Sequence, residues 1–143
     1  MGRARASLLS RLDAELERFG LTGMQFAALK HLAEGAARTA ADLSRFMQYD
    51  TGAMTRIVDR LEQRGLVRRE RCRDDRRVVF LRVAPAGRAQ LPRLLAIATR
   101  VLEAHLAGFS ATEVAALKEY LGRMIANGEG PRDSPPPPGG ARL

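Results

Sequence analysis

The chain is poor in cysteine, histidine and aromatic residues, with one cysteine, two histidines and no tryptophan among 143 residues. Its single cysteine, Cys72, cannot build a disulfide framework, which fits a protein of the reducing cytoplasm. A structural zinc site needs about four nitrogen or sulfur ligands, and Cys72 with the distant His31 and His105 does not supply them. We therefore expect no metal site and no cofactor.

Long apolar runs are missing as well. No stretch approaches the roughly 18 uninterrupted apolar residues that suggest a membrane-spanning helix. Near the N-terminus, Leu8 and Leu9 are followed directly by Ser10 and Arg11, so a signal peptide is not expected. The sequence also has no glycine-rich phosphate loop, no histidine–carboxylate cluster and no nucleophile motif, which disfavours an enzyme.

Arginine, by contrast, is abundant. The 24 basic residues exceed the 16 acidic ones by eight, and all the basic residues except Lys30 and Lys118 are arginine. The guanidinium of arginine is a rigid fork of donors that suits phosphate and guanine. A basic chain is attracted to polyanions, which means nucleic acid or an anionic membrane surface. The apolar fraction of 45% is ordinary for a folded protein, and the length suits about one domain.

Apolar spacing predicts six helices and two strands. Leu8, Leu12, Leu16 and Phe19, for example, recur at three- and four-residue spacing, which places them on one helix face. A later run rich in β-branched and aromatic residues indicates two antiparallel strands joined by a charged turn. The expected helices cover about residues 1–19, 23–35, 39–47, 51–64, 85–107 and 111–127, and the strands cover about 66–71 and 78–83.

Polar residues mark several expected helix ends. Thr39 with Asp42 three residues later resembles a capping box, in which each side chain accepts a hydrogen bond from the other's backbone N–H. Ser110 with Glu113 forms a second such pair, and Asp50 is a suitable N-cap for the helix that follows it.

Proline affects the C-terminal part of the chain. Pro85 can occupy the first turn of a helix, whereas Pro92 should bend that helix or mark its effective start. Residues 128–143 contain four consecutive prolines followed by two glycines and have almost nothing to bury. This composition predicts a disordered or polyproline-II tail.

The expected fold class is therefore mainly α with a small β-hairpin, in the order α-α-α-α-β-β-α-α. The net charge is concentrated in residues 64–82, which contain eight arginines and three acids, or five of the eight excess positive charges. We call these residues the basic segment. By itself, such a segment is most often a solvated charge run. Here it follows a short helix pair, and a helix-turn-helix with a basic ribbon is a known way to bind DNA.

Four motifs between residues 21 and 87 resemble those of the MarR family of winged helix-turn-helix repressors, named for multiple antibiotic resistance. The resemblance runs from about Leu21 to Ile125, and its most specific part is the continuous block 55–69 with the wing motif that follows. The motifs are LTGMQFAAL at 21–29, TRIVDRLEQRGLVRR at 55–69, DDRR at 74–77 and PAG at 85–87.

The resemblance implies a homodimer that binds a short imperfect palindrome in duplex DNA. Residues 1–127 would form one domain of this type, with residues 21–85 as the winged DNA-binding region. The terminal helices, in 1–20 and 86–127, would pair with those of a second chain. Each protomer would present residues 51–64 to one half-site, and the half-sites would lie about one helical turn, ~34 Å, apart.

The resemblance also assigns expected DNA contacts to the second helix of the pair. Four of them lie at the exposed N-terminal side of this helix: Thr51, Gly52, Thr55 and Arg56. Gln48 lies just before the helix, and Arg60 lies at its flank. Gly52 would let the DNA backbone come close. The alternative for Arg56 and Arg60 is a surface ion pair with Asp59 or Glu62.

In the wing, the minor-groove arginine of the family falls on Arg77, with Arg76 as the second choice. Asp75 would hold Arg77 in place. Arg73 would bind phosphate, as would backbone N–H groups near Thr39. The family usually has threonine where this chain has Ala84, so the following helix lacks that N-cap hydroxyl.

Many members of the family are released from DNA by a small aromatic acid, and the expected function is a repressor of this kind. His31, Arg11 and Arg18 are weak candidates for binding its carboxylate. Cys72, between two arginines, is a candidate redox sensor, although a structural role is the default. Activation in place of repression stays open, and so does a nonspecific or RNA-binding basic protein, although RNA readers usually offer more aromatic residues.

Overall fold

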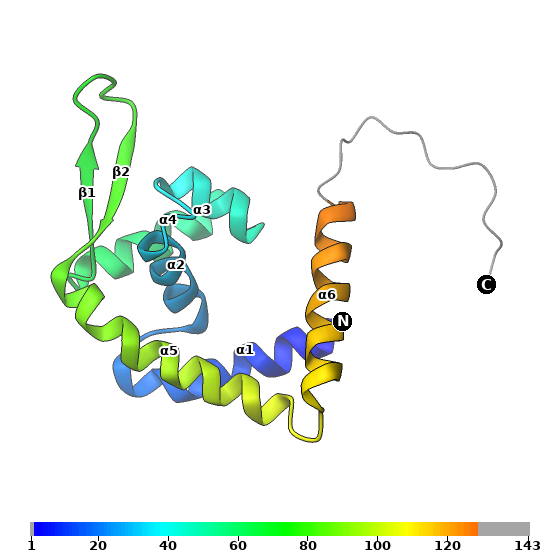
Figure 1. Ribbon diagram of the computed structural model, residues 1–143. Helices are drawn as coiled ribbons and strands as arrows, with labels where there is room; N and C mark the ends of the chain where they lie inside the picture. Colours follow the sequence, from blue (N-terminus) through cyan, green and yellow to red (C-terminus); the bar gives the residue numbers. More distant parts are fainter. Residues whose placement is uncertain (1, 129–143) are drawn as a thin grey trace, which may run out of the picture. The chain divides into compact units, whose positions relative to one another are not determined.

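The computed structural model describes residues 2–128 and confirms the predicted order of helices and strands (Figure 1). The described residues divide into two compact units, residues 2–105 and residues 106–128. The elements are α1 (Gly2–Leu16), a 3₁₀ turn η1 (Glu17–Phe19), α2 (Gly23–Ala33), α3 (Ala40–Met47), α4 (Thr51–Gln63), β1 (Val67–Arg71), β2 (Val79–Val83), α5 (Pro85–His105) and α6 (Ala111–Gly128).

The predicted N-caps of α3 and α4 are confirmed. The Thr39 hydroxyl accepts a hydrogen bond from Asp42 N, and the Asp42 carboxylate accepts one from Thr39 N. Asp50 accepts from Ala53 N at 2.9 Å, so α4 starts directly after it. A second capping box, between Thr22 and Gln25, starts α2. These caps satisfy backbone N–H groups that have no partner within their own helix.

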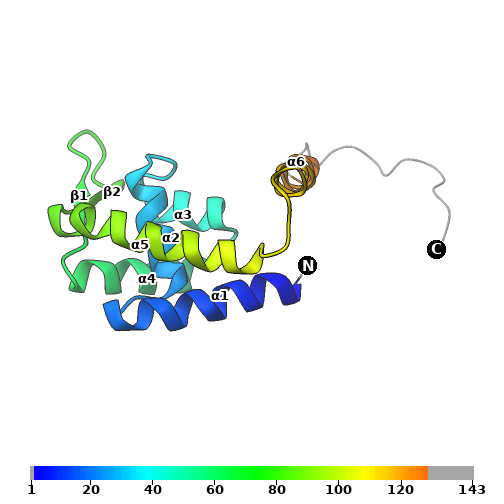
Figure 2. The ribbon, with the colours of Figure 1, turned by 60° about the horizontal axis from the view of Figure 1, so that its bottom comes forward.

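A single apolar core holds the first unit together. It is built from the inward faces of the five helices and from the base of the hairpin. Its largest fully buried side chains are Leu16, Leu29, Leu43, Met54, Leu61, Leu66, Leu94, Val58 and Val67. In Figure 2, α1 and α5 run side by side along one edge of this unit, and they pack against each other.

Helix α5 runs through Pro92 without interruption. The prediction that Pro92 marks the effective start of this helix is therefore wrong, because the helix already begins at Pro85. Pro92 is exposed, while Leu94, Ile97 and Val101 are buried beyond it. Burial of this apolar stripe stabilises the helix enough to offset the one backbone hydrogen bond that proline removes.

The first turn of α5 packs tightly against the base of the hairpin. A Cβ atom on Gly87 would overlap the carbonyl oxygen of Leu66, so only glycine fits there. The same carbonyl accepts a hydrogen bond from Ala84 N at 2.9 Å. This close approach explains why the proline-alanine-glycine motif ends in glycine.

The second unit contains α6. The predicted capping box is confirmed, since the Ser110 amide donates to Glu113 Oε2 at 2.8 Å and Glu113 N donates to Ser110 Oγ at 3.3 Å. Hydrogen bonds from Ser110 lower the pKa of Glu113. No residue of α6 is buried in the single chain. The proline-rich segment predicted as a tail lies outside the described residues, apart from Gly128.

Two negative findings concern the described residues 2–128. No helix among them is long and apolar enough to cross a membrane. Within the same range, no group of three or more histidine, cysteine, aspartate or glutamate side chains is arranged to hold a metal ion.

Candidate nucleic-acid interface

Helices α3 and α4 form a helix-turn-helix with a very short turn. Gln48 closes α3 in the left-handed region, with φ of 48°, which is uncommon for a residue other than glycine. Backbone bonds from Gln48 N to Arg45 O and from Tyr49 N to Ser44 O fix the turn. Asp50 then caps α4. The exposed Gln48 side chain is thereby held just before the N-terminus of α4.

Helix α4 has one buried and one exposed face. Met54, Val58 and Leu61 are fully buried, and they fix the rotation of the helix about its axis. The residues predicted to face DNA in its N-terminal half are all exposed: Thr51, Gly52, Thr55 and Arg56. The Thr55 hydroxyl donates to Thr51 O at 3.0 Å, so its oxygen is left as an acceptor.

Arg60 lies at the side of this exposed face. It lines a surface groove of about 570 Å³ together with residues of α1 and of the following turn, among them Asp13, Glu17 and Gly20. Within the described residues, no ion pair joins Arg56 or Arg60 to Asp59 or Glu62. The alternative interpretation of these two arginines as surface ion pairs is therefore not observed.

Asp59 and Glu62 instead bind Arg69, which reaches back from β1. Arg69 Nη2 lies 2.6 Å from Asp59 Oδ1, and Arg69 Nη1 pairs with Glu62 Oε2. The backbone N–H of Arg69 also donates to Glu62 Oε1 at 3.2 Å. Hydrogen bonding to Asp59 raises the pKa of Arg69 above its usual value. This Arg69 cluster fastens the hairpin to the outer side of α4.

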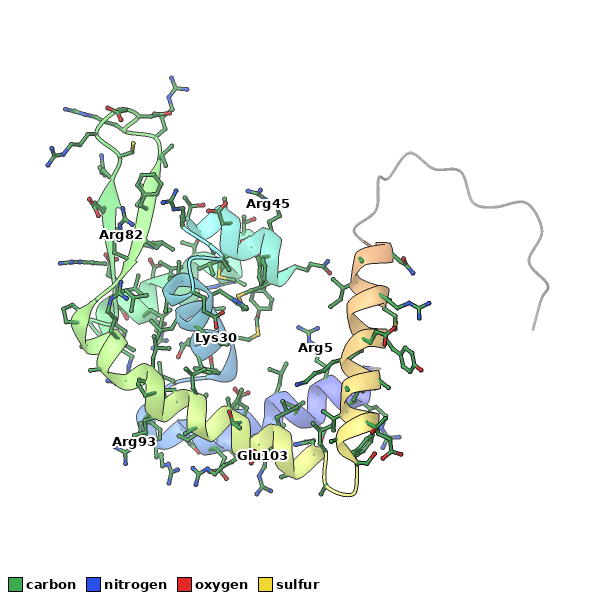
Figure 3. The ribbon with its side chains drawn as sticks, in the orientation of Figure 1. Arg5, Lys30, Arg45, Arg82, Arg93 and Glu103 are labelled. Atoms are coloured by element: carbon green, nitrogen blue, oxygen red, sulfur yellow. The ribbon has the colours of Figure 1, made fainter. Side chains whose placement is uncertain are left out.

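The hairpin has an inner and an outer face. In its antiparallel register Val67 lies opposite Val83, and Arg69 lies opposite Leu81. Val67, Leu81 and Val83 are buried, so this face joins the core. The outer face carries Arg82, labelled in Figure 3, whose Nε lies 3.1 Å from Glu70 Oε2 on the neighbouring strand.

The tip of the hairpin is a hydrogen-bonded turn over residues 75–78. Val78 N donates to Asp75 O at 3.0 Å, and Arg77 N donates to the Asp75 carboxylate at 3.0 Å. The side chain of Asp75 thus holds the backbone at Arg77, as in an Asx turn. Arg76 and Arg77 are the two central residues of the turn, and both are exposed.

The eight arginines of the basic segment fall into two groups. Three are tied to the protein itself: Arg64 donates to backbone carbonyls, Arg69 binds two carboxylates and Arg82 pairs with Glu70. The other five are exposed and make no ion pair with the residues that the structure describes: Arg68, Arg71, Arg73, Arg76 and Arg77. The free positive charge is therefore concentrated toward the tip.

The structure narrows the expected phosphate contact by backbone N–H groups near Thr39. The backbone N–H groups of Arg38, Thr39 and Asp42, at the start of α3, already donate to protein oxygens. The hydrogen bond from the backbone of Arg38 is the main cause of the lowered pKa of the Asp42 carboxyl, and the bonds from Thr39 lower this pKa as well. The amide of Thr39 is therefore not free for phosphate, because the capping box that starts the helix uses it.

The weak ligand candidates lie in different surroundings. The rings of His31 and Phe46 pack together with their centroids 4.6 Å apart, and burial lowers the pKa of His31. Arg11 and Arg18 each lie within 4.0 Å of Glu15 on their own helical segment. The structure does not bring these three residues together.

Cys72 is half-buried at the end of β1. Its backbone N–H donates to Val78 O at 2.9 Å, directly beside the turn at the tip. Its backbone therefore contributes to the closure of the hairpin.

Sequence patterns missed the residues that join the elements to one another. Asp59 and Glu62 were considered only as partners of neighbouring arginines, whereas their partner is Arg69. A signal was present, since two acids three residues apart on one helix face a strand with an arginine. The hydrogen bond from Leu81 N to Arg38 O, which ties β2 to the loop before α3, left no such signal.

Comparison with known proteins places this geometry among transcriptional regulators. A model described as "MarR family" matches residues 19–78. An uncharacterized HTH-type transcriptional regulator, YdgJ, from Bacillus subtilis is 32% identical over 87 residues. That match covers 61% of this chain and 53% of the relative, so the chain spans about half of this relative's length.

Two solved structures are similar over almost the whole described chain. A probable transcriptional regulator from Pseudomonas aeruginosa is 33% identical, with a TM-score of 0.73, over 87% of this chain and 96% of that one. A mutant of MarR from E. coli, complexed with operator DNA, is 25% identical, with a TM-score of 0.77, over 87% of this chain and 89% of that one.

Proposed function

The chain belongs to the MarR family of DNA-binding winged-helix transcriptional regulators, and on that premise we propose that it is a homodimeric repressor. It would bind a pseudo-palindromic operator in duplex DNA and be released by a small aromatic or phenolic ligand. The relatives and solved structures that resemble the chain are transcriptional regulators and not enzymes, in line with the expectation from the sequence. Since the proposed partner is chromosomal DNA, we expect the protein to act in the cytoplasm.

The observation that carries this proposal is the pairing of two exposed polar surfaces on one compact unit. The first is the N-terminal face of α4, and the second is the tip of the hairpin. The Arg69 cluster connects the two elements through short charged contacts. A helix with this exposed face suits the major groove, where each base pair shows a distinct edge. The guanidinium groups at the tip suit the minor groove beside it.

The residue roles follow from this arrangement. Gln48, Thr51, Thr55 and Arg56 would contact bases and phosphates in the major groove, with Gly52 allowing a close approach. Arg77 would enter the minor groove, with Arg76 as the second choice, and Arg73 would bind a nearby phosphate. Arg60 would contact DNA at the flank of the helix, with its place in the groove beside α1 limiting its reach. Asp75 would hold the turn at Arg77.

The exposed apolar residues of α6 support a dimer. Tyr120, Leu121, Met124 and Ile125 recur on one side of this helix and are all exposed in the single chain. An apolar helix face of this kind needs a partner. We propose that residues 1–20 and 86–127 pair with those of a second copy, with residues 21–85 as the DNA-binding region.

The proposal is tested by measuring binding to the DNA upstream of the protein's own gene. Fluorescence anisotropy would compare a duplex of that region with a shuffled duplex of equal length and base composition. A specific regulator typically binds its site at least ~10³-fold more tightly than other DNA. Equal affinity for the two duplexes would contradict the proposal and favour a nonspecific basic protein. Light scattering should give twice the mass of the chain, and a monomer bound to its operator would contradict the dimer.

The ligand class is tested separately. A panel of benzoates and phenols would be added to the protein–operator complex at increasing concentration. Release of the DNA by one of them, with a matching rise in the melting temperature of the free protein, would support this class. Stable complexes with the whole panel, alongside specific DNA binding, would contradict the ligand class and leave the DNA-binding proposal intact.

A further inference from the structure

Arg64 joins the end of α4, which we call the recognition helix, to the turn that ends α1. Its Nη1 lies 2.9 Å from the carbonyl oxygen of Gly20, and its Nη2 lies 2.6 Å from that of Phe19. These two carbonyls end the 3₁₀ turn that follows α1, where the backbone acceptors have no partner within the helix. The forked guanidinium satisfies both acceptors at once, and its positive charge suits the negative end of a helix.

The backbone conformation is well defined on both sides of this contact, at Arg64 and at Gly20. Arg64 immediately follows the last residue of α4, and its own N–H donates to Arg60 O at 3.2 Å. Gly65 then leaves the helix with φ of 67°. At the other end, Gly20 has φ of 64°, and a Cβ atom there would overlap Nη1 of Arg64. Glycine at position 20 therefore provides both the turn and the space for the guanidinium.

The link spans elements that are distant in the sequence. Phe19 and Arg64 are separated by 45 positions. Helix α4 packs mainly on α2, α3 and β1, whereas α1 packs mainly on α5. Arg64 thus ties the recognition helix directly to the α1–α5 pair. It is not available for phosphate in the way that the five free arginines of the basic segment are.

We propose that Arg64 is a positioning residue that sets the angle of the recognition helix against helices α1 and α5. In a dimer, that angle fixes the distance between the two recognition helices and so the preferred spacing of the two half-sites. This inference rests on the proposed function. It predicts that loss of Arg64 weakens the preference for one half-site spacing, whereas loss of a DNA-contacting arginine lowers affinity for all spacings alike.

The test measures affinity for a series of operators in which the spacing between half-sites changes by one base pair at a time. The wild-type protein should bind one spacing at least about tenfold more tightly than its neighbours. Arg64→Gln should bind the best operator about tenfold more weakly, in line with lost hydrogen bonds from a charged group. Its preference among spacings should fall to within about twofold. Arg64→Lys has a point charge in place of the forked guanidinium, so its affinity and its spacing preference should lie between those of the wild type and Arg64→Gln.

Two controls separate positioning from charge and from folding. Arg82→Gln removes an equal charge from an exposed position of β2, outside the proposed dimer interface, and should keep the wild-type spacing preference. Gly20→Ala keeps every arginine but displaces the guanidinium of Arg64, and it should flatten the preference as Arg64→Gln does. A lowered melting temperature alone, with the wild-type preference intact in Arg64→Gln, would overturn the proposal.

The outcomes also distinguish the two levels of inference. If the wild-type protein binds no DNA specifically, the proposed function fails. If it does, and the spacing profile of Arg64→Gln matches that of the wild type, only the role of Arg64 fails. A distance measurement between spin labels at Gln63→Cys, in a Cys72→Ser background, gives a readout without DNA. The distribution should be narrow with Arg64 and broad with Arg64→Gln, and two equal distributions would contradict the proposal.

Discussion

The base and the tip of the hairpin are both rich in arginine, but the two regions use it differently. At the base, Arg69 binds Asp59 and Glu62, and Arg82 pairs with Glu70. At the tip, Arg77 contacts Asp75 through its backbone N–H alone, and the side chains of Arg76 and Arg77 are exposed. The same residue type thus holds the protein together in one region and leaves charge free for a polyanion in the other. Net charge alone does not distinguish these uses.

The largest effect on DNA binding is expected at the tip. Arg77→Ala should weaken binding to the operator by about 10- to 100-fold, since a guanidinium in a groove is worth roughly 1–3 kcal/mol. Its melting temperature should stay unchanged, because the side chain makes no contact that holds the fold. Anisotropy and thermal unfolding measure the two quantities. A marked loss of thermal stability with full affinity would reverse the assignment of the tip.

A mixed effect is expected at the base for Arg69→Met. This change leaves Asp59 and Glu62 close together without their cation, and the free energy of unfolding should fall by about 1 kcal/mol. Operator affinity should fall about tenfold because the hairpin is no longer fastened to α4. Arg68→Met, which removes an unpaired arginine from the same strand, is the matched control and should leave the stability unchanged. Equal stability of both variants would show that the Arg69 cluster does not hold the hairpin.

A smaller effect is expected from the turn that presents Arg77. Asp75→Ala removes the hydrogen bond to Arg77 N, whose net value is about 1 kcal/mol, and should weaken operator binding about fivefold. Asp75→Asn removes the same negative charge but keeps an acceptor for the bond. The asparagine variant should therefore bind at least as tightly as the wild type. Equal losses in the two variants would mean that the charge, and not the turn, is what counts.

The smallest effect is expected for the exposed pair of Arg82 and Glu70. Arg82→Gln should change the free energy of unfolding by less than about 0.5 kcal/mol, because both side chains are largely exposed to solvent. Chemical denaturation measures this change. Operator affinity should stay within about twofold of the wild-type value. A loss as large as that of Arg69→Met would mean that the outer face of the hairpin also takes part in binding or folding.

Local patterns predicted the local structure well. The spacing of Leu12 and Leu16, the caps at Thr39 and Asp50, and the β-branched and aromatic residues of β2 each depend on residues close in the sequence, and the structure confirms the elements they predict. The prediction that α5 effectively starts at Pro92 was wrong, because burial of Leu94 and its neighbours outweighs the tendency of proline to interrupt a helix.

The contacts that build the site join residues far apart, and apart from the spacing of Asp59 and Glu62 no local pattern in the sequence marks them. Arg64 and Arg69 look like any other members of a basic run, yet their partners lie 44 and 10 positions away. Which arginines are free was therefore decided by the fold. The exposed face of α4 could be predicted, because the helical period of its buried residues defines the opposite side.

The contacts of Arg69 and Leu81 have a consequence for how the protein behaves at high concentration. These residues lie opposite each other in the hairpin, yet Arg69 N donates to Glu62 and Leu81 N donates to Arg38 O. At this level both outer edges of the small sheet are therefore already closed by the protein's own acceptors. A two-stranded ribbon is normally open to pairing with a strand from another molecule. Here a neighbouring chain finds these two amides occupied, so growth of the sheet into aggregates is blocked where the hairpin is most apolar.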